Sequence, residues 1–579
     1  MKHLQLQGKE IAKEKLSKFH WQVLLVFSLI FIRYLFFGFQ YFYQLDDYIQ
    51  HHNYAAYTQF ELGKTWELIL TVGLLIYRPM AGFLDMTLWS LFFEEMIIGV
   101  AIITCLYALS ALLFYRLLKE FFHCSPLFLV IYTMIPLGFE GTYWMSASTR
   151  IIPGLFFTAL CATLFHKFCK QGRKRDLLLY FIVQCLSYSF YEQAMVLSIT
   201  CVGFLTIYHF FHNRKRCYWG LSFLASVGLY VFITKTAGNY TDLINRRTEL
   251  IFPTSNYYYE VFLPDLLGQL KQSFLHGGFY TLFKGFFRGI EMIFSSFHFI
   301  YLILAFVLPA FLFSLSWSNE SQKVNENREE SVTEKEKKLP SYVALIVGFL
   351  LFLAPISMFF LVANPWFGLR NTVLSFLGIA FMIDTVFSLI SKKMPKAKNL
   401  PAVTAYCLAV ASIIASVSEL SDYKSTYEDD TQVVSAIYPY IAEFSTSQRV
   451  GLLGVEPSYL SETNFSFHEH FHGVTESNWA LTGCMVAYAE GGVADLVPLP
   501  VEKQTYYPWH GGSLRPEEGA YDAFFYYDHE TGTVTPLTCV TYKPEEEYHF
   551  YDESGNLFAN LQDWLDNGYI YLEEDLLLD

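Results

Sequence analysis

The sequence predicts an α-helical polytopic membrane protein that ends in a small extracytoplasmic α/β domain. The chain of 579 residues is 53% hydrophobic but only 16% charged, whereas soluble domains contain about 25% charged residues. Apolar runs of bilayer length alternate with short basic clusters up to about residue 418, and the composition then becomes polar. These observations predict a membrane domain over residues 1–418 and a separate domain over residues 419–579.

The net charge of −14 arises largely from an acidic excess after Glu419, which argues against nucleic acid as a partner. Ten cysteines in so long a chain do not indicate a disulfide framework. Cys484 and Cys539 both fall in the polar tail, where a bridge between them stays open. The basic amino terminus leads into an apolar run at Trp21 without a small-residue cleavage site, which favours a retained signal anchor.

Membrane spans follow from length and hydropathy, because a hydrocarbon core of ~30 Å requires roughly 20 apolar residues per helix. By this criterion about eleven segments are candidates: 20–42, 91–115, 125–139, 151–168, 177–191, 194–211, 218–234, 291–316, 341–361, 370–390 and 399–418. The segments 125–139 and 177–191 are short, and such segments either tilt into a protein-lined cavity or do not span.

The distribution of positive charge predicts the direction of these spans, since Lys and Arg accumulate on the cytoplasmic side. With the amino terminus inside a cytoplasmic (plasma) membrane, every second loop is basic. The inside segments are the clusters at 116–119, 167–175, 214–216 and 392–398, together with a polar linker at 318–340 whose composition predicts disorder. The outside segments are a first outer loop at 43–90, the corner at 143–150, the turn at Tyr191, a second outer loop at 236–290, the turn at 364–370 and the terminal domain.

Two adjacent carboxylates, Asp46 and Asp47, come directly after the first span. At low dielectric they would repel each other and one pKa would rise, as in a general base or a metal clamp. If a helix begins here, His51 shares a face with Asp47. The alternative is a structural helix cap, for which Asp is favoured. Further along the loop, residues 65–76 are predicted to lie along the interface as an amphipathic helix. This helix would place Arg78 at headgroup level, where it either holds a lipid phosphate or snorkels to ordinary headgroups.

Other polar residues on the predicted outer side are weaker candidates. The aromatic pair Tyr143–Trp144 either stacks on a sugar or belongs to an interfacial aromatic belt. An acid that interrupts an apolar stretch, and arginines on the non-cytoplasmic side, each suggest an anionic or polar ligand. These residues are Tyr143, Trp144, Arg150, Glu192, Arg246 with its neighbour Arg247, and Arg370. In the tail, His468, His470 and His472 alternate as metal ligands do on a strand, but a solvated loop is the favoured interpretation.

The layout resembles the GT-C glycosyltransferases, which have a basic amino terminus, one span, and a carboxylate pair at the head of a long first outer loop. The residues that carry the resemblance are Asp46 and Asp47 and, less securely, Arg78. It implies a polyprenyl-linked sugar donor on the outer leaflet and a glycan, lipid or protein acceptor. It further implies Asp46 as base, Asp47 as orienting partner or ligand of a divalent metal (Mg or Mn), and Arg78, with Arg370 or Arg246 as substitutes, on the phosphate. A single displacement would invert the anomeric centre.

Three other functions remain open on the sequence. One is a lipid-linked glycan polymerase or ligase, which also uses outer arginines. Another is a transporter or flippase, although matched broken helices in two halves are not visible. The third is a surface-binding protein anchored by its helices.

In the tail, a helix at 431–444, a strand at 449–455 and a hairpin around Gly532 predict the α/β domain.

Overall fold

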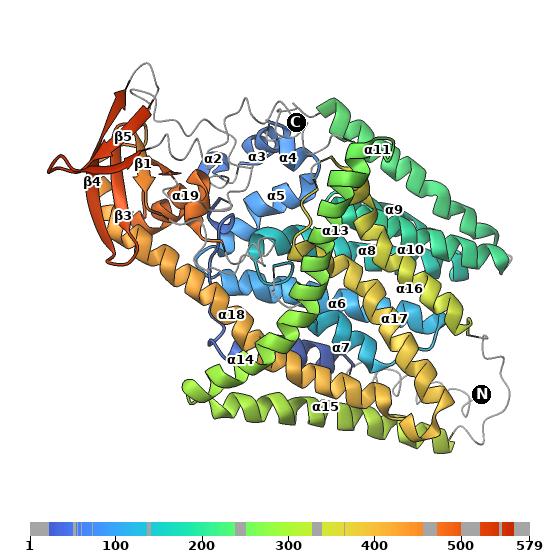
Figure 1. The fold of residues 1–579 in the computed structure, drawn as a ribbon. Coiled ribbons are helices and arrows are strands. Elements are labelled where there is room, and N and C mark those ends of the chain that lie inside the picture. Colours follow the sequence, from blue (N-terminus) through green and yellow to red (C-terminus); the bar gives the residue numbers. More distant parts are fainter. Residues whose placement is uncertain are drawn as a thin grey trace. The chain divides into compact units, whose positions relative to one another are not determined.

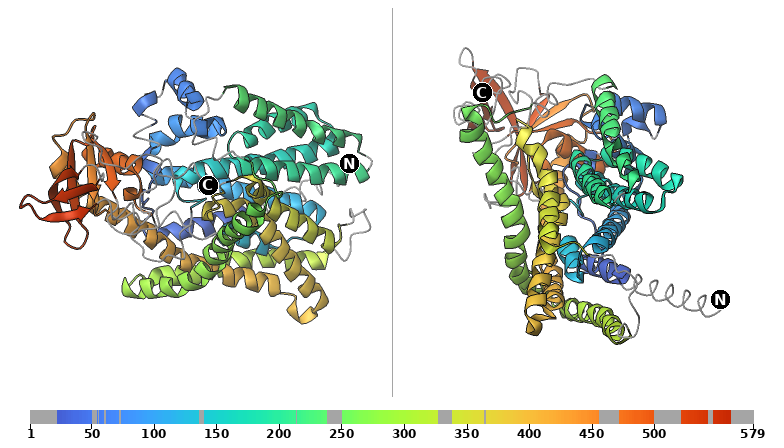
Figure 2. Two further views of the ribbon diagram at one scale, coloured as in Figure 1. Left: turned by 45° about the horizontal axis from the view of Figure 1, so that its top comes forward. Right: turned by 90° about the vertical axis from the view of Figure 1, so that its right-hand side faces the viewer.

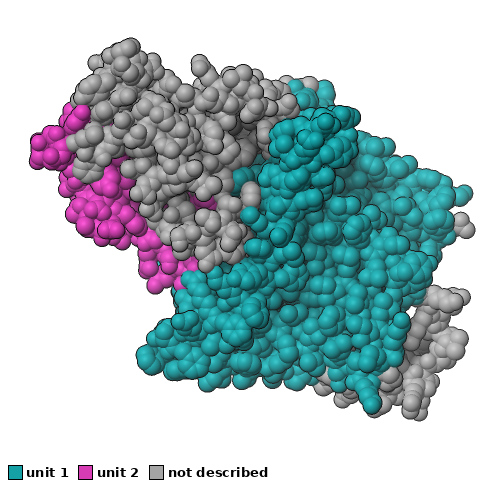
Figure 3. Space-filling view, viewed as in Figure 1, with its two compact units in different colours: residues 1–41, 65–420 teal, residues 42–64, 421–579 magenta. Residues whose placement is uncertain are grey.

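The computed structural model of the protein describes the chain in two compact units. The described residues are 22–49, 54, 56–59, 61–71, 73–135, 140–212, 214–237, 250–326, 338–363, 365–455, 472–499, 521–542 and 547–560. Unit 1 comprises Met1–Tyr41 and Thr65–Leu420, and unit 2 comprises Phe42–Lys64 and Ser421–Asp579. Figure 3 colours the two units. The segment after the first apolar helix thus belongs to the unit that contains the C-terminal domain.

Unit 1 is built from helices (Figure 1). In chain order they are Gln22–Leu35, α4 (Gly73–Ile76), α5 (Pro79–Thr87), η2 (Trp89–Phe92), α6 (Met96–Phe121), α7 (Pro126–Met134), α8 (Met145–Gln171), α9 (Lys174–Tyr188), α10 (Glu192–Phe211), η3 (Lys215–Ser222), α11 (Phe223–Ala237), η4 (Tyr258–Phe262), α13 (Leu263–Lys271), η5 (Gln272–Tyr280), α14 (Thr281–Ser295), α15 (Phe299–Glu326), α16 (Ser341–Ile356), η6 (Ser357–Leu361), η7 (Leu369–Asn371), α17 (Thr372–Lys393), η8 (Pro395–Ala397) and α18 (Leu400–Ile441). Between Gln22–Leu35 and α4, the helix α3 (Leu62–Thr71) contains the boundary at Lys64 and Thr65 between the two units.

Seven helices in the described part of the chain are long and apolar enough to cross a membrane. They are Met96–Phe121, Met145–Gln171, Glu192–Phe211, Lys215–Ile233, Ser341–Leu361, Leu369–Lys393 and Leu400–Ile441, and Gln22–Leu35 and Phe299–Ser314 are shorter apolar helices. The helical class and the membrane character are therefore supported. The predicted spans 125–139 and 177–191 form α7 and α9, which have 9 and 15 residues.

Local signals explain where several helices begin and end. Pro79 opens α5, where its missing N–H costs nothing. The Ser125 hydroxyl accepts a hydrogen bond from the Leu127 amide at 3.2 Å and caps α7, which also has a proline in its first turn. Gly172 ends α8 in the left-handed conformation (φ 72°), and its amide bonds to the carbonyl of Phe168. The elements at these positions are therefore encoded by short-range chemistry.

The turns of unit 1 gather at its two opposite ends. At one end, called the basic end, the Lys338 ammonium donates to the Glu120 carbonyl at 2.8 Å and Arg216 donates to the Cys169 carbonyl at 3.4 Å. In the same region, Lys170 forms an ion pair with Glu120. The other end, called the site end, comprises the segments 78–85, 140–150, 191–193 and 365–371, whose contacts are described below. The positive-charge rule predicts that the basic end faces the cytoplasm.

Residues 258–295, which belong to the segment predicted as the second outer loop (236–290), form one continuous helix, here named the crossing helix. It consists of η4, α13, η5 and α14, with π-helical geometry in η4 and η5. Figures 1 and 2 show the course of this helix in green. The placement of the segment 236–290 on the outer side of the membrane stays a prediction, and the helix itself did not stand out in the sequence because Lys, Gln, Ser and Gly dilute its hydropathy. These small and polar residues pack against other helices of unit 1.

Unit 2 holds a six-stranded sheet in the order β2-β1-β3-β4-β5-β6. The strands are β1 (Arg449–Leu453), β2 (Asp495–Leu499), β3 (Ala523–Asp528), β4 (Thr533–Tyr542), β5 (Glu547–Tyr551) and β6 (Leu557–Asn560). β1 pairs in parallel with both β2 and β3, and the remaining pairs are antiparallel. The helix α19 (Asn478–Ala489) connects β1 to β2 and packs on β2, as a parallel crossover requires. The predicted hairpin around Gly532 is confirmed as β3–β4.

α18 is one uninterrupted helix of 42 residues, whereas the sequence predicts a span at 399–418 and a second helix at 431–444. The residues between them are polar, but they include neither Gly nor Pro, so nothing local ends the helix. The helix therefore continues from unit 1 into unit 2. Further short helices described in unit 2 are α2 (Ala56–Thr58) and η11 (Val474–Glu476).

Candidate functional site

The two predicted catalytic carboxylates lie in unit 2 and face different environments. Asp47 is fully buried, and its Oδ2 accepts a hydrogen bond from the backbone amide of Gln44 at 3.0 Å. The Asp47 amide in turn donates to the Gln44 carbonyl at 2.9 Å. These two bonds close a turn, which differs from the helix cap considered as the alternative because the amide that Asp47 accepts from precedes it in the chain. Asp46, by contrast, is only partly buried.

Asp46 lies next to an aromatic side chain that sequence reasoning missed. Its Oδ1 is 3.4 Å from the indole Nε1 of Trp479, a residue of α19 that is 37% exposed. Leu45, directly before the pair, has a left-handed backbone (φ 34°), which is unfavourable for a residue with a side chain. Strained backbone of this kind clusters at functional sites. The segment is fixed against α19 because Gly483 approaches the Tyr48 Cβ so closely that a methyl group there would lie 3.0 Å away.

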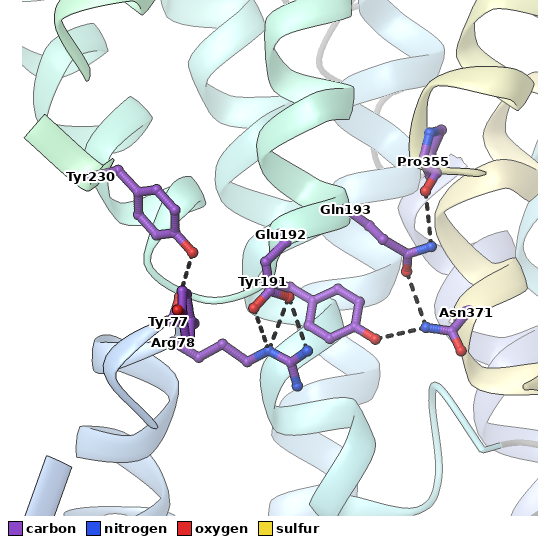
Figure 4. Close-up of polar contacts among 8 residues, drawn as sticks. All are labelled: Tyr77, Arg78, Tyr191, Glu192, Gln193, Tyr230, Pro355 and Asn371. Atoms are coloured by element: carbon purple, nitrogen blue, oxygen red, sulfur yellow. Dashed lines mark hydrogen bonds and ion pairs between the residues drawn. The ribbon is translucent and has the colours of Figure 1, made fainter. Parts of the chain in front are cut away.

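At the site end of unit 1, Arg78 forms a bidentate ion pair with Glu192 (Figure 4). Its Nε is 3.0 Å from both carboxylate oxygens, and its Nη2 is 2.9 Å from Oε2. The guanidinium also lies 4.4 Å from the centre of the Tyr191 ring. Both charged side chains are about one-fifth exposed, at 23% and 19%. Arg78 directly precedes α5 and Glu192 begins α10, so the pair joins the start of α5 to the start of the long apolar helix α10.

Asn371 is the second centre of contacts at the site end (Figure 4). Its side-chain amide donates to the Tyr191 hydroxyl at 2.7 Å and to the Gln193 carbonyl oxygen at 3.3 Å. Gln193 in turn donates to the Pro355 carbonyl at 3.0 Å, and the Asn371 oxygen accepts from the Gly368 amide at 3.0 Å. The first turn of α10 is thereby bonded to the segment between α16 and α17.

A second ion pair joins α5 to α8. Asp85 is fully buried and its Oδ2 is 3.4 Å from Nε of Arg150. Burial raises the pKa of Asp85 to about 6, and the positive charge of Arg150 only partly offsets this increase. The carboxyl group can therefore exchange a proton near neutral pH. Its other oxygen has no hydrogen-bond partner in the described part of the chain.

Of the remaining predicted residues of the site end, Tyr143 and Trp144 are buried and Arg370 is partly buried. The Arg370 guanidinium lies 5.4 Å from the centre of the Trp144 ring, and its backbone amide donates to Glu140 at 3.1 Å. Trp144 is 1% exposed and Tyr143 is fully buried. Tyr143 stacks on Tyr34 with ring centres 5.8 Å apart. These two aromatic rings are therefore core residues in this conformation and do not offer a face to a sugar.

The structure thus brings Arg78, Arg150, Glu192, Trp144 and Arg370 together at one end of unit 1. Asp46 and Asp47 belong to unit 2. The predicted site residues His51 and Arg246, and the histidines at 468 and 470, lie outside the described residues. Cys484 and Cys539 are both free thiols.

Sequence reasoning missed five further residues of these clusters, namely Asp85, Tyr191, Gln193, Asn371 and Trp479. Asp85 offered a signal, because an acid inside an apolar segment requires a partner. Gln193 carried a weaker signal of the same kind, as the residue after Glu192. Tyr191 and Trp479 carried none, since aromatic residues are abundant throughout this chain. Within the described residues, no three His, Cys, Asp or Glu side chains converge as metal ligands do.

The turn that carries Arg370 is held by two buried side chains of the crossing helix. Gln269 accepts a hydrogen bond from the Phe367 amide at 2.8 Å and donates to Asp265 at 2.9 Å, while the Ser273 hydroxyl donates to the Phe367 carbonyl at 2.9 Å. We expect Gln269→Leu to lower the free energy of unfolding by about 1–3 kcal/mol, because the buried Phe367 amide loses its acceptor.

Faster amide hydrogen exchange over residues 367–371 is the measurement that localises this effect. Gln272→Leu is the matched control, since the Gln272 side-chain oxygen has no partner in the described part of the chain. Equal effects of the two substitutions would contradict the assigned role of Gln269.

Comparison with known protein families and with curated proteins finds no match to this chain. The function is therefore argued from the sequence pattern and the geometry of these residues.

Proposed function

We propose that the chain is a membrane glycosyltransferase that moves a sugar from a polyprenyl-phosphate or polyprenyl-diphosphate donor to an acceptor hydroxyl outside the membrane. The observation that carries the proposal is Asp46, a partly buried carboxylate beside the exposed indole of Trp479 in the segment after the first apolar helix. A carboxylate can remove the proton of an attacking hydroxyl. The indole offers both an aromatic surface and a hydrogen-bond donor next to it.

In the proposed reaction, Asp46 takes the proton of the acceptor hydroxyl. The acceptor oxygen then bonds to the anomeric carbon while the bond from that carbon to the phosphate oxygen breaks. The lipid phosphate departs with the electron pair, so the anomeric centre is inverted. Asp47 holds the turn through Gln44 and orients its neighbour. A divalent metal at Asp47 stays a prediction.

The arginines of the site end favour an anionic headgroup in their vicinity. Arg78 and Arg150 each pair with a buried or half-buried acid, and Arg370 lies on an aromatic face. A phosphate at Arg78 would have to compete with Glu192 for the guanidinium fork. In this proposal the arginines supply positive potential at the site end. An arginine contacts the phosphate directly only after its ion pair with Glu192 or Asp85 has opened.

The proposal is tested with membrane vesicles that contain the full chain and polyprenyl-phosphate glucose or mannose, labelled in the sugar, and with the corresponding diphosphates. The expected result is chain-dependent movement of label from the lipid to a water-soluble or polymeric product. Movement of uncleaved donor across the bilayer would instead indicate a flippase. Joining of whole lipid-linked glycans would indicate a polymerase or ligase. Absence of chain-dependent transfer from all four donors would refute the glycosyltransferase assignment.

A further inference from the structure

The crossing helix, residues 258–295, contacts three membrane helices at the same level. Phe274 packs on Phe352 with ring centres 5.4 Å apart, four residues before the end of α16. It also packs on Phe376, four residues after the start of α17, at 6.0 Å. Gly289 lies against the Ile414 backbone of α18. The Arg288 guanidinium donates to the Ser418 hydroxyl at 3.2 Å, one turn further along α18.

These contacts all lie at the same end of the three spans. α16 and α17 are joined by the segment 357–371, so the end of α16 and the start of α17 face the same side. The short segment 394–399 joins α17 to α18 at the other side. From that side α18 runs back along α17, so Ile414 lies at about the level of Phe376. Between Phe274 and Gly289 the crossing helix advances by about 22 Å. A helix that advances so far without changing level runs across the spans and not alongside them, as Figure 1 shows.

The two faces of the crossing helix differ in an unusual way. The buried face toward unit 1 carries small or polar residues beside a few large apolar ones. The small or polar residues are Gln269, Ser273, Gly277, Gly278, Thr281, Gly285 and Gly289, and the large ones are Tyr258, Phe262, Leu266, Phe274 and Ile293. The outward face carries large apolar side chains, which are exposed by 41% to 66%: Leu267, Leu275, Phe279, Phe283, Phe287 and Phe294. A helix at a water-exposed surface has the reverse arrangement. Small residues toward the protein and large apolar residues outward are typical of helices that pack in lipid.

Charged residues accompany this apolar face. Lys271, Lys284 and Glu291 are exposed on the crossing helix, whereas they would be costly in the middle of a bilayer. Amphipathic helices at the boundary between headgroups and acyl chains combine such charges with Phe and Leu. The apolar face also continues into α15, whose Ile300, Ile303 and Val307 are exposed by 56% to 64%.

We propose that the crossing helix lies in the plane of the membrane at the site end of unit 1, with its Leu275–Phe279–Phe283–Phe287 edge in contact with the lipids of that leaflet. Its partner is the bilayer itself, at the boundary between headgroups and acyl chains. This placement is independent of the proposed glycosyltransferase activity. With this placement, one face of the crossing helix contacts lipid while Gln269 and Ser273 on the opposite face bind the turn at Phe367.

Nitroxide labels test the placement in the full chain reconstituted into phosphatidylcholine–phosphatidylglycerol vesicles. One accessible cysteine at a time is introduced at positions 275, 279, 283 and 287. Before this, the native cysteines that are exposed or partly exposed are replaced by Ser: Cys105, Cys124, Cys185, Cys407 and Cys539. Depth is measured from the relative access of oxygen and of a water-soluble nickel chelate. Positions 300, 303, 307 and 311 on the outward face of α15 form the matched series, because Phe299–Ser314 is an apolar helix that leads away from the site end.

The expected result is one shallow depth for all four labels on the crossing helix, while depth changes by about 16 Å along the α15 series. A depth gradient along 275–287 equal to that of α15 would mean that the helix spans the membrane. Preferential access of the nickel chelate would mean that it lies in water, and exclusion of both reagents would mean that protein covers it. Each of these three results overturns the proposal. Thermal unfolding of each labelled protein shows whether the labelled chain is still folded.

Discussion

Asp46→Asn is expected to lower the rate of sugar transfer by about 10²–10⁴-fold, the range typical of removing a general base. The asparagine side chain fills the same space and still accepts a hydrogen bond from the Trp479 indole, so the fold should be preserved. Only the ability to take a proton is lost. The measurement is the initial rate of label transfer from polyprenyl-phosphate sugar in vesicles with equal amounts of each variant.

Asp47→Asn should abolish transfer for a related reason. Its amide oxygen can still accept from the Gln44 amide, so the turn remains closed while the negative charge next to Asp46 disappears. Glu61→Gln is the matched control in the same segment, because Glu61 forms an exposed ion pair with Lys64 and should not affect the rate. Full activity of both aspartate variants would remove the pair from the proposed mechanism.

Breaking the Arg78–Glu192 pair is expected to produce the largest loss of stability in unit 1. Glu192→Gln leaves the Arg78 guanidinium half-buried with no countercharge, and removing one partner of a buried pair costs about 3–5 kcal/mol. Since both side chains are about one-fifth exposed, we expect the lower part of that range. Arg78→Met should have a similar effect while its side chain still covers the Tyr191 ring.

The double variant Arg78→Met/Glu192→Gln is expected to be more stable than the sum of the two single effects implies, by about 1–3 kcal/mol. Unfolding in detergent micelles, followed by near-UV circular dichroism, provides the measurement. The exposed pair Lys64–Glu61 serves as the comparison, with a coupling of less than about 1 kcal/mol. Strictly additive effects at Arg78 and Glu192 would contradict the assigned pairing.

The helical membrane character could be predicted from the sequence because apolar runs of sufficient length have few alternatives in structure. The spans at 151–168 and 341–361 fall within the helices Met145–Gln171 and Ser341–Leu361, and the span at 91–115 overlaps Met96–Phe121 over residues 96–115. Strand β1 and the β3–β4 hairpin were predictable as well, because alternation and Gly532 are local signals. The crossing helix could not be predicted from the length of apolar runs, because its large apolar residues lie on only one face and are separated by polar and small residues.

The polar residues of the site could be recognised individually but not paired. Arg78 and Glu192 attract attention because each is an ionisable residue at the edge of an apolar segment. Their pairing joins positions 114 residues apart, and no local pattern encodes it. Asn371, which bonds to Tyr191 and Gln193 on another helix, is an ordinary turn residue in the sequence. Such pairings depend on which helices are neighbours.

The sequence by itself determined that the chain alternates between lipid-compatible helices and polar turns, because hydropathy and charge act over one helix length at a time. It also placed the carboxylate pair after the first apolar helix. The tertiary structure alone decided that Asp47 closes a buried turn while Asp46 lies beside Trp479. It likewise decided that Arg78 is held by Glu192 and that residues 258–295 run across the spans. The physical reason is that burial and pairing are set by side chains from distant segments, whose contacts exist only after the helices have packed.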